Sequence, residues 1–517
     1  MARNLIAEAR PTSAPGEMQR VARGGAFALV GVASSAVLQF ALVLVVTHGL
    51  PRATAGAFLE AVALFMILSN LTELGADTGV VRMVPRLRAT GREGDLRALV
   101  RAAVVPVALA GAAAALFMLV LAGPASHVLF GSQAQSGKTF LVVLAPALPF
   151  ACVLTVLLAV TRGFGRMRPF VLITNVWVPG ARLIAVAAVI VLIGSDPAAL
   201  ALAWAVPLVI GITVAAAAVR RELRRRPVTI AGSDVAGELW RFSIPRAFAV
   251  GCAVTVNWVD VLLVGAIAGT RSAAVYGAIS RLSVIGAYGL QTIGMVVAPR
   301  MSALMAVEDT PSLDHLYQSA TKWAVIVSWP LYLLMVVFAP LFARIFGQEY
   351  RSGATALAVL AVAGLVNLAT GNAMVLLLMA GKSSWNLLDS AGSMIANLAL
   401  NLLLIPPFGI TGAAIAWSVS IVGTNLVSVI QVRRATGLQP FGRGYALACV
   451  LPLVCFGLLG LVVRSVAGWE LPLVVLTTLV GTLLYVPLLA RFRDPLSLPE
   501  LAGGLRLRLS PGRARSA

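Results

Sequence analysis

The chain has 517 residues, of which 59% are hydrophobic and only 12% are charged, and its formal net charge is +20. Charged residues make up about a quarter of an average soluble protein, so this composition excludes an ordinary soluble domain and indicates a polytopic membrane protein. The basic residues lie in short segments between apolar runs, and this pattern argues against nucleic acid as a partner.

Apolar runs of roughly 20 residues, the length of helix that spans a bilayer, recur along the whole chain. We therefore predict an all-α protein with about fourteen transmembrane helices. Their expected limits are 24–47, 55–76, 99–122, 139–161, 169–194, 197–219, 242–267, 273–298, 321–342, 354–380, 384–405, 411–432, 444–464 and 470–490.

Arginine is dense in alternate connecting segments, and this bias predicts the orientation in the membrane. The dense segments include Arg82–Arg101, Arg162–Arg168 and Arg220–Arg226, whereas the opposite side of the predicted bilayer has few basic residues. We therefore expect a multi-pass protein of the cell membrane with both tails, 1–23 and 491–517, in the cytoplasm. The basic residues of that side are expected to meet anionic lipid headgroups.

An ordered series of short matches, about 215 residues apart, divides the chain into two similar halves. PRATAGAF (Pro51–Phe58) corresponds to TRSAAVY (Thr270–Tyr276), and the pair Arg220–Arg221 corresponds to Arg433–Arg434. Two parallel repeats that face each other leave a cleft at their pseudo-two-fold axis, where a transporter holds its substrate. The expected units are six-helix bundles at 24–226 and 227–434, and helices 13 and 14 at 435–490.

Several longer motifs, taken in order, resemble one family of transporters. They are the short loop before AGAF (Ala55–Phe58), LGADTGVVRMVPRLRATGREGDLRALV (Leu74–Val100), WVDVLLVGAIAGTRSAAVYGAISRL (Trp258–Leu282), IFGQEYRSGATAL (Ile345–Leu357) and LNLLLIPPFGITGAAIAWSVS (Leu400–Ser420). The chain resembles the multidrug/oligosaccharidyl-lipid/polysaccharide exporter superfamily, and within it the polysaccharide (O-antigen-type) flippase branch. The resemblance implies a transporter that moves a polyprenyl-pyrophosphate-linked oligosaccharide or polysaccharide precursor to the outer leaflet by alternating access.

Ionisable residues deep in a membrane cost roughly 2.5–3.5 kcal/mol each on insertion scales, so each needs a reason. Asp260 and Arg281 lie in neighbouring helices joined by a short turn. Both are expected about 10–12 Å below the outer surface. Asn257 shares the face of Asp260. Two interpretations are open: a cleft-facing group in which Arg281 binds the pyrophosphate, or an ion pair that holds the two helices together.

Arg182 falls near the middle of predicted helix 5, which has no acid to neutralise it, and Asn175 lies on the same face. A guanidinium at this depth suits a wet cleft and binds phosphate in a bidentate manner. Arg182 is therefore a candidate substrate ligand, with pairing to an acid of another helix, such as Asp389 or Glu60, or snorkelling as the alternatives.

Other polar residues of the predicted spans are also candidates. In helix 11, Asp389 and Asn397 belong to a polar stripe that faces either the cleft or another helix. In helix 2, Glu60, Glu73 and Asp77 are candidates for gating between the halves or for a proton or sodium site. Pairing of Glu73 and Asp77 with the arginines of the following loop is the simpler alternative.

We predict no catalytic residues, no metal site and no cofactor, because the histidines are scattered and no nucleophile or paired carboxylates stand out. The expected partners are the lipid-linked glycan, membrane lipids, a polysaccharide polymerase and glycosyltransferases. Two alternatives share the fold, a MATE-type drug or cation antiporter and a lipid II flippase, and a membrane glycosyltransferase or ligase is a more remote one. The basic charge in helix 5 and the absence of acids in helix 1 favour an anionic substrate.

Overall fold

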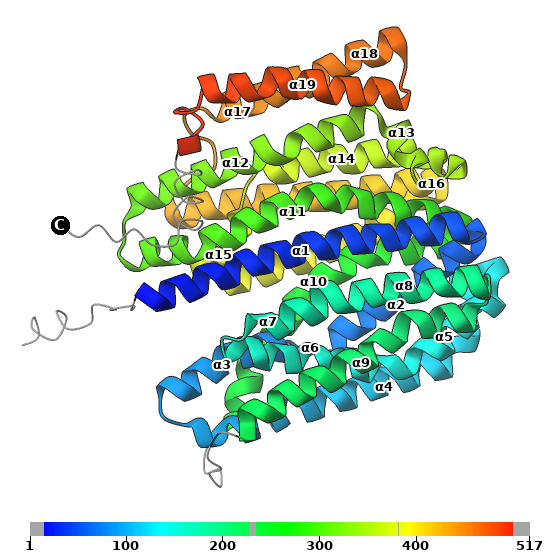
Figure 1. Cartoon of the computed structure of the whole chain (residues 1–517), viewed down its shortest axis with the longest axis vertical. Coiled ribbons are helices and arrows are strands. Elements are labelled where there is room, and N and C mark those ends of the chain that lie inside the picture. Colours follow the sequence, from blue (N-terminus) through cyan, green and yellow to red (C-terminus); the bar gives the residue numbers. More distant parts are fainter. Residues whose placement is uncertain (1–14, 225, 227–233, 381, 500–517) are drawn as a thin grey trace, which may run out of the picture.

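The computed structural model describes residues 15–224, 226, 234–380 and 382–499, and within these ranges it contains helices but no strand. The long helices lie roughly side by side, as in a bilayer-spanning bundle (Figure 1). Eleven stretches in the described residues are long and apolar enough to cross a membrane. Two of them, Glu93–Gly163 and Ser384–Thr436, have 71 and 53 residues, more than twice one span of about 20. The all-α polytopic fold is therefore confirmed, and the number fourteen stays a prediction. The ends of both predicted tails, residues 1–14 and 500–517, lie outside the described residues.

The first half of the chain forms one group of helices. Its elements are α1 (Pro15–Gly49), α2 (Arg52–Thr72), α3 (Ala76–Ala89), the 3-10 turn η1 (Glu93–Asp95), α4 (Leu96–Phe130), η2 (Gly131–Gln133), α5 (Ala134–Leu144), η3 (Ala145–Ala147), α6 (Leu148–Gly163), α7 (Met167–Phe170), the π-helical segment η4 (Val171–Trp177), α8 (Val178–Leu192) and α9 (Pro197–Arg224).

The second half begins with α10 and ends with a helical hairpin. Its elements are α10 (Val235–Ala268), α11 (Thr270–Ala306), α12 (Thr310–Val337), α13 (Ala339–Arg344), η5 (Gln348–Gly353), α14 (Ala354–Ala369), α15 (Ala373–Met379) and α16 (Ser383–Thr436). Gly409 has a non-helical backbone inside α16 and marks the bend between the two arms that the sequence predicts as helices 11 and 12.

Predicted helix 10 (354–380) is not continuous, because the chain leaves helical geometry between α14 and α15. Gly371 has φ +67°, in the left-handed region that glycine adopts readily. Two tyrosines take up carbonyls near the break: the Tyr445 hydroxyl donates to Ala369 O at 2.9 Å and the Tyr317 hydroxyl to Thr370 O at 3.4 Å. A broken membrane helix is stable when neighbouring groups satisfy its backbone in this way.

The last helices, α17 (Tyr445–Pro452), the π-helical η6 (Leu453–Leu458), α18 (Leu459–Ala467) and α19 (Leu471–Arg491), lie at one edge of the molecule beside α12 (Figure 1). The chain after α19 folds back onto α12. There the Lys322 ammonium group donates to Ser497 Oγ at 2.8 Å and to Pro495 O at 3.1 Å. The indole of Trp323 donates to Ser497 O at 3.2 Å. These contacts attach residues 495–497 to the second half.

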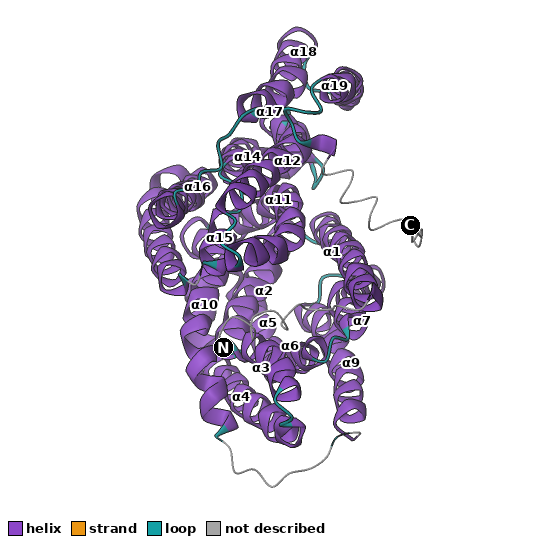
Figure 2. Cartoon of the chain, turned by 90° about the vertical axis from the view of Figure 1, so that its left-hand side faces the viewer, coloured by secondary structure: helices purple, strands orange, loops and turns teal. Residues whose placement is uncertain are grey.

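Helix α10 contacts both halves of the molecule, and the predicted bundle boundary at residue 227 stays a prediction. Its outer part packs against α11 and α16, and its first turns pack against α3 and α4 of the first half (Figure 2). A side chain at Gly79 of α3 would overlap Ser243 and Leu239 of α10, so the two helices touch closely there. The Arg82 guanidinium lies 4.2 Å from the centre of the Phe242 ring.

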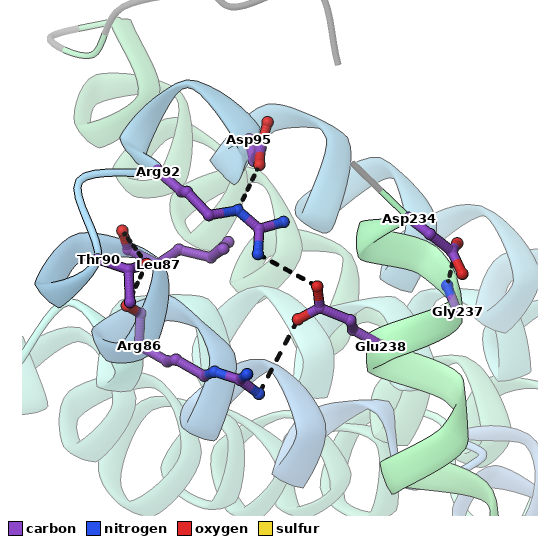
Figure 3. A network of polar contacts seen from close by, with 8 residues as sticks. All are labelled: Arg86, Leu87, Thr90, Arg92, Asp95, Asp234, Gly237 and Glu238. Carbon is purple, nitrogen blue, oxygen red and sulfur yellow. Dashed lines mark hydrogen bonds and ion pairs between the residues drawn. The ribbon is translucent and has the colours of Figure 1, made fainter. Parts of the chain in front are cut away.

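A polar network strengthens this contact at the basic end of the molecule (Figure 3). Glu238 of α10 accepts from Arg92 at 3.1 Å and lies 3.9 Å from Arg86, while Arg92 also donates to Asp95 at 3.0 Å. Nearby, Glu93 takes two hydrogen bonds from Arg226, at 2.7 and 2.6 Å. These bonds hold the pKa of Glu93 below its ordinary value, so the carboxylate stays ionised.

At the opposite end of the molecule, α2 meets α11 directly. Gly56 lies so close to α11 that an added methyl group would overlap the backbone of Thr270 and approach that of Ala274. The Arg52 side chain donates to Arg271 O at 3.0 Å. Arg52 and Arg271 are also the arginines that the internal repeat matches. Each half therefore contributes the start of its second helix to this contact.

Candidate functional site

The polar side chains of α10, α11 and α16 converge at one place in the second half. Asp260 is 2% exposed and accepts hydrogen bonds from the Tyr276 hydroxyl of α11 and the Asn401 amide of α16, both at 2.8 Å. Asn397, one turn before Asn401, is fully buried, and its side-chain amide has no hydrogen-bond partner. This cluster of a carboxylate, a phenol and two amides joins three helices across the bundle.

Arg281 lies beside this cluster but does not form the predicted ion pair with Asp260. Its guanidinium lies 3.7 Å from the centre of the Trp258 ring and donates a long hydrogen bond, 3.4 Å, to Asn257 O. The physical reason is that Tyr276 and Asn401 already take up the Asp260 carboxylate, while the indole of Trp258 offers a cation–π contact of about 1–2 kcal/mol.

A small cavity separates the two charges. Asn257, Asp260, Tyr276, Arg281 and Trp417 are among its lining residues, and its volume is about 20 Å³. This volume holds a water molecule, since one water needs roughly 10–15 Å³, and it is far too small for a sugar. Asn257 is exposed, and its side chain donates to Ala253 O at 2.8 Å. Arg281 and Asn257 thus lie at the rim of the cluster, and Asp260 lies behind them.

Arg182 has a different environment from the predicted wet cleft. It is 9% exposed, its Nε donates to Trp204 O of α9 at 2.9 Å, and its guanidinium lies 3.4 Å from the centre of the Trp204 ring. Arg182 therefore binds backbone and indole inside the first bundle, and neither Asp389 nor Glu60 pairs with it.

Asn175 is 8% exposed in the π-helical segment η4, where a side chain at Gly31 of α1 would overlap Val171 and crowd the Asn175 amide. Asp389 accepts from Gln431 of the opposite arm of α16 at 2.7 Å, while its second oxygen has no hydrogen-bond partner. The two residues lie in different halves, and the structure does not bring either of them to the cluster around Asp260.

The acids of α2 and α3 have different surroundings. Glu60 is fully buried, neither of its carboxylate oxygens has a hydrogen-bond partner, and a methyl group added at Gly265 of α10 would overlap its carboxyl group. Glu73 ends α2, and Asp77, in the first turn of α3, accepts from the Thr78 hydroxyl at 3.2 Å. Of the three, Glu60 is buried most deeply between the halves.

Sequence reasoning missed Tyr276, Trp258 and Asn401. Asn401 continues the stripe of Asp389 and Asn397 by one more turn of the same helix, so the spacing of four residues carried a usable signal. Trp258 and Tyr276 are ordinary residues of membrane helices. Only the packing of α10 against α11 shows that they hold the two charged side chains.

Comparison with known proteins identifies the family of this chain and solved structures that share its fold. Residues 21–305 match the family described as "Polysaccharide biosynthesis protein". No curated protein matches the chain in sequence. Among solved structures, the lipid II flippase MurJ in an inward closed conformation is 9% identical, with a TM-score of 0.69 over 90% of this chain and 98% of the other.

Two further structures have the same fold. An inward-facing multidrug resistance MATE family transporter of the MOP superfamily is 14% identical, with a TM-score of 0.67 over 79% of this chain and 98% of that one. A MOP superfamily transporter from Pyrococcus furiosus, also 14% identical, gives a TM-score of 0.55 over 81% and 95%. Because the family match spans more than half of the sequence and the fold agrees, this chain belongs to the polysaccharide biosynthesis protein family and has the fold of the MOP superfamily.

Proposed function

We propose that the protein is a flippase that moves a polyprenyl-pyrophosphate-linked oligosaccharide or polysaccharide precursor from the cytoplasmic to the outer leaflet of the cell membrane. Both chain ends lie in the cytoplasm in this proposal, and the polymerase and glycosyltransferases that act on the same glycan are its expected partners. The family match over residues 21–305 carries the proposal. The two-half fold suits alternating access, and family and fold together favour a transporter over an enzyme.

Within this function, Arg281 is the residue that we assign to the pyrophosphate. The Trp258 ring restrains its guanidinium, which makes one long hydrogen bond and no ion pair within the described residues. Bidentate hydrogen bonds to a phosphate are stronger than these contacts. Asp260, held by Tyr276 and Asn401, fixes the helices that carry Arg281 and Asn257. Arg182, which Trp204 already holds, is not assigned to the substrate.

The test measures flipping in vesicles that contain the purified protein and a lipid-linked oligosaccharide, with an impermeant glycosidase as the probe. We expect Arg281→Ala to reduce flipping by about 100-fold, since a charged hydrogen bond to phosphate contributes roughly 1.5–3 kcal/mol. Arg281→Lys keeps the charge but loses the bidentate geometry and should recover only part of the rate.

Arg300→Ala is the matched control, because Arg300 is an exposed arginine at the far end of the same helix α11. It should flip the glycan at the wild-type rate. Wild-type flipping by Arg281→Ala would remove Arg281 from the site and leave the function intact. A wild-type protein that flips no lipid-linked glycan but exchanges cationic drugs would overturn the proposed function itself in favour of the antiporter alternative.

A further inference from the structure

The last turns of α9 carry three exposed arginines, Arg220, Arg221 and Arg224, and none of them has an acidic partner within the described residues. Several other arginines at the same end of the first half have acidic partners. Arg166 pairs with Glu222 at 2.8 Å. Arg92 pairs with Glu238 in the network of Figure 3, and Arg226 pairs with Glu93. The end of α9 therefore carries a group of three positive charges without a carboxylate partner among the described residues.

The three arginines line a hollow of about 380 Å³, and Ala217 also lines it within the part of the chain that the structure describes. Pockets that take small ligands have volumes of roughly 300–1,000 Å³. One turn further into the membrane, Val214, Ile210 and Val206 are exposed on the same face of α9 by 53%, 45% and 49%. An apolar face that leads into a group of cations matches the shape of a lipid, with an acyl chain above and an anionic headgroup below.

The internal repeat offers a comparison within the same molecule. Arg433 and Arg434, which correspond to Arg220 and Arg221, are also exposed near a helix end. Ile430, 50% exposed, stands where α9 has Ala217, and Gly437 stands where α9 has Arg224. The second half thus has a bulky side chain in place of the small one that leaves the hollow open, and it lacks the third cation. Both features of the α9 site are specific to the first half.

We propose that Arg220, Arg221 and Arg224 bind the phosphate of one anionic phospholipid, whose acyl chain lies along Val214, Ile210 and Val206. Guanidinium groups bind phosphate oxygens through charge-assisted hydrogen bonds, and the position at the membrane surface suits a headgroup. A helix C-terminus also favours basic residues, which accounts for the pair that both halves share. It does not account for Ala217 or for the third arginine. The site does not depend on the identity of the transported glycan.

The test uses the full-length protein in detergent and counts retained phosphatidylglycerol molecules by native mass spectrometry, with phosphatidylcholine as the uncharged comparison. Wild-type protein should retain one phosphatidylglycerol in preference to phosphatidylcholine. The triple variant Arg220→Gln/Arg221→Gln/Arg224→Gln should retain it roughly tenfold more weakly. Ala217→Ile, which fills the hollow without a change of charge, should weaken retention to a similar extent.

The control is Arg433→Gln/Arg434→Gln, which removes two charges from the corresponding helix and should keep the lipid. Equal loss in this control and the triple variant would mean a diffuse basic surface and overturn the site, as would full retention by Ala217→Ile. Inorganic phosphate should not displace the lipid, because it has no acyl chain. Displacement by phosphate would assign the hollow to a soluble anion instead.

Discussion

Glu60 is an acidic residue buried where the two halves of the molecule touch. Its carboxyl group packs on Gly265 of α10, and neither oxygen has a hydrogen-bond partner. Burial of a polar group without a partner is costly, so this residue depends on close packing with its neighbour. Gly265 has no side chain and so leaves room for the carboxyl group at this approach of α2 to α10. Its role in gating or in coupling to an ion stays a prediction.

We expect Gly265→Ala to lower the free energy of unfolding by about 1–3 kcal/mol, because the new methyl group overlaps the Glu60 carboxyl group. Glu60→Ala in the same chain should restore part of this loss, and a double-mutant cycle of thermal unfolding measures the coupling. Gly423→Ala is the control, since nothing lies within 4 Å of a side chain at that glycine. If Gly265→Ala unfolds at the same temperature as this control, the contact is not tight.

For Asp260 and Arg281, the sequence predicts that the two residues lie close together but does not predict their partners. Helix length and a short turn predicted that both charges lie near each other, and they line one cavity. Their partners were not predictable in the same way. Trp258 is two residues before Asp260, but only the orientation of α11 brings Arg281 over its ring. Asn401 is 141 residues from Asp260, and no local spacing reveals such a contact.

Helix α10 is the element that connects the halves. Its first turns contact the first half, through Glu238, Phe242 and Ser243, although the sequence predicts that residues 227–434 form the second bundle and its linker. Periodicity and repeats identify which segments correspond. They do not say against which neighbour a long helix packs. Hydropathy likewise predicted helix 10 as one continuous span. Glycine is common in membrane helices, so a residue such as Gly371 does not by itself indicate a break in the helix.

We expect Glu238→Gln to destabilise the protein slightly at low ionic strength, by about 0.5–1 kcal/mol, since half-exposed ion pairs contribute little. The loss should shrink at high salt, where the screening length falls to about 3 Å. Thermal unfolding of purified variants at low and high salt measures it. Glu308→Gln, an exposed acid at the same end of the molecule, should show no salt-dependent difference. An equal effect of both substitutions would show that the network of Figure 3 does not hold α10.

At the scale of the whole molecule, the halves touch through the starts of α2 and α11, at the end that the sequence predicts to be outer, and through α3 and α10 at the basic end. The family and the general fold could be predicted from apolar length, arginine distribution and ordered motifs. The closeness of the outer contact could not, because it depends on which glycine of α2 faces the backbone of α11.

A bulky residue at Gly56 should hold this contact open. In Gly56→Leu, the side chain would overlap the backbone of Thr270, so α2 and α11 must move apart. The measurement is the labelling of Ala274→Cys by an impermeant maleimide, in a chain whose four native cysteines are replaced. Ala274 is fully buried, so the label should react in Gly56→Leu and not otherwise.

Gly123→Leu is the control for this experiment, because nothing lies within 4 Å of a side chain at Gly123, and it should leave the cysteine protected. Protection of Ala274→Cys in the Gly56→Leu protein would contradict a tight outer contact at this glycine. Equal labelling with and without the substitution would mean that the contact already opens freely.

The hydrogen bonds of Lys322 can form only late in the synthesis of the protein. Its acceptors at Arg443 O, Pro495 O and Ser497 Oγ lie 121, 173 and 175 residues further along the chain. When α12 leaves the ribosome, none of these groups has yet been made. The hydrogen bonds of Lys322 to Pro495 O and Ser497 Oγ can therefore form only after α19 has been synthesised.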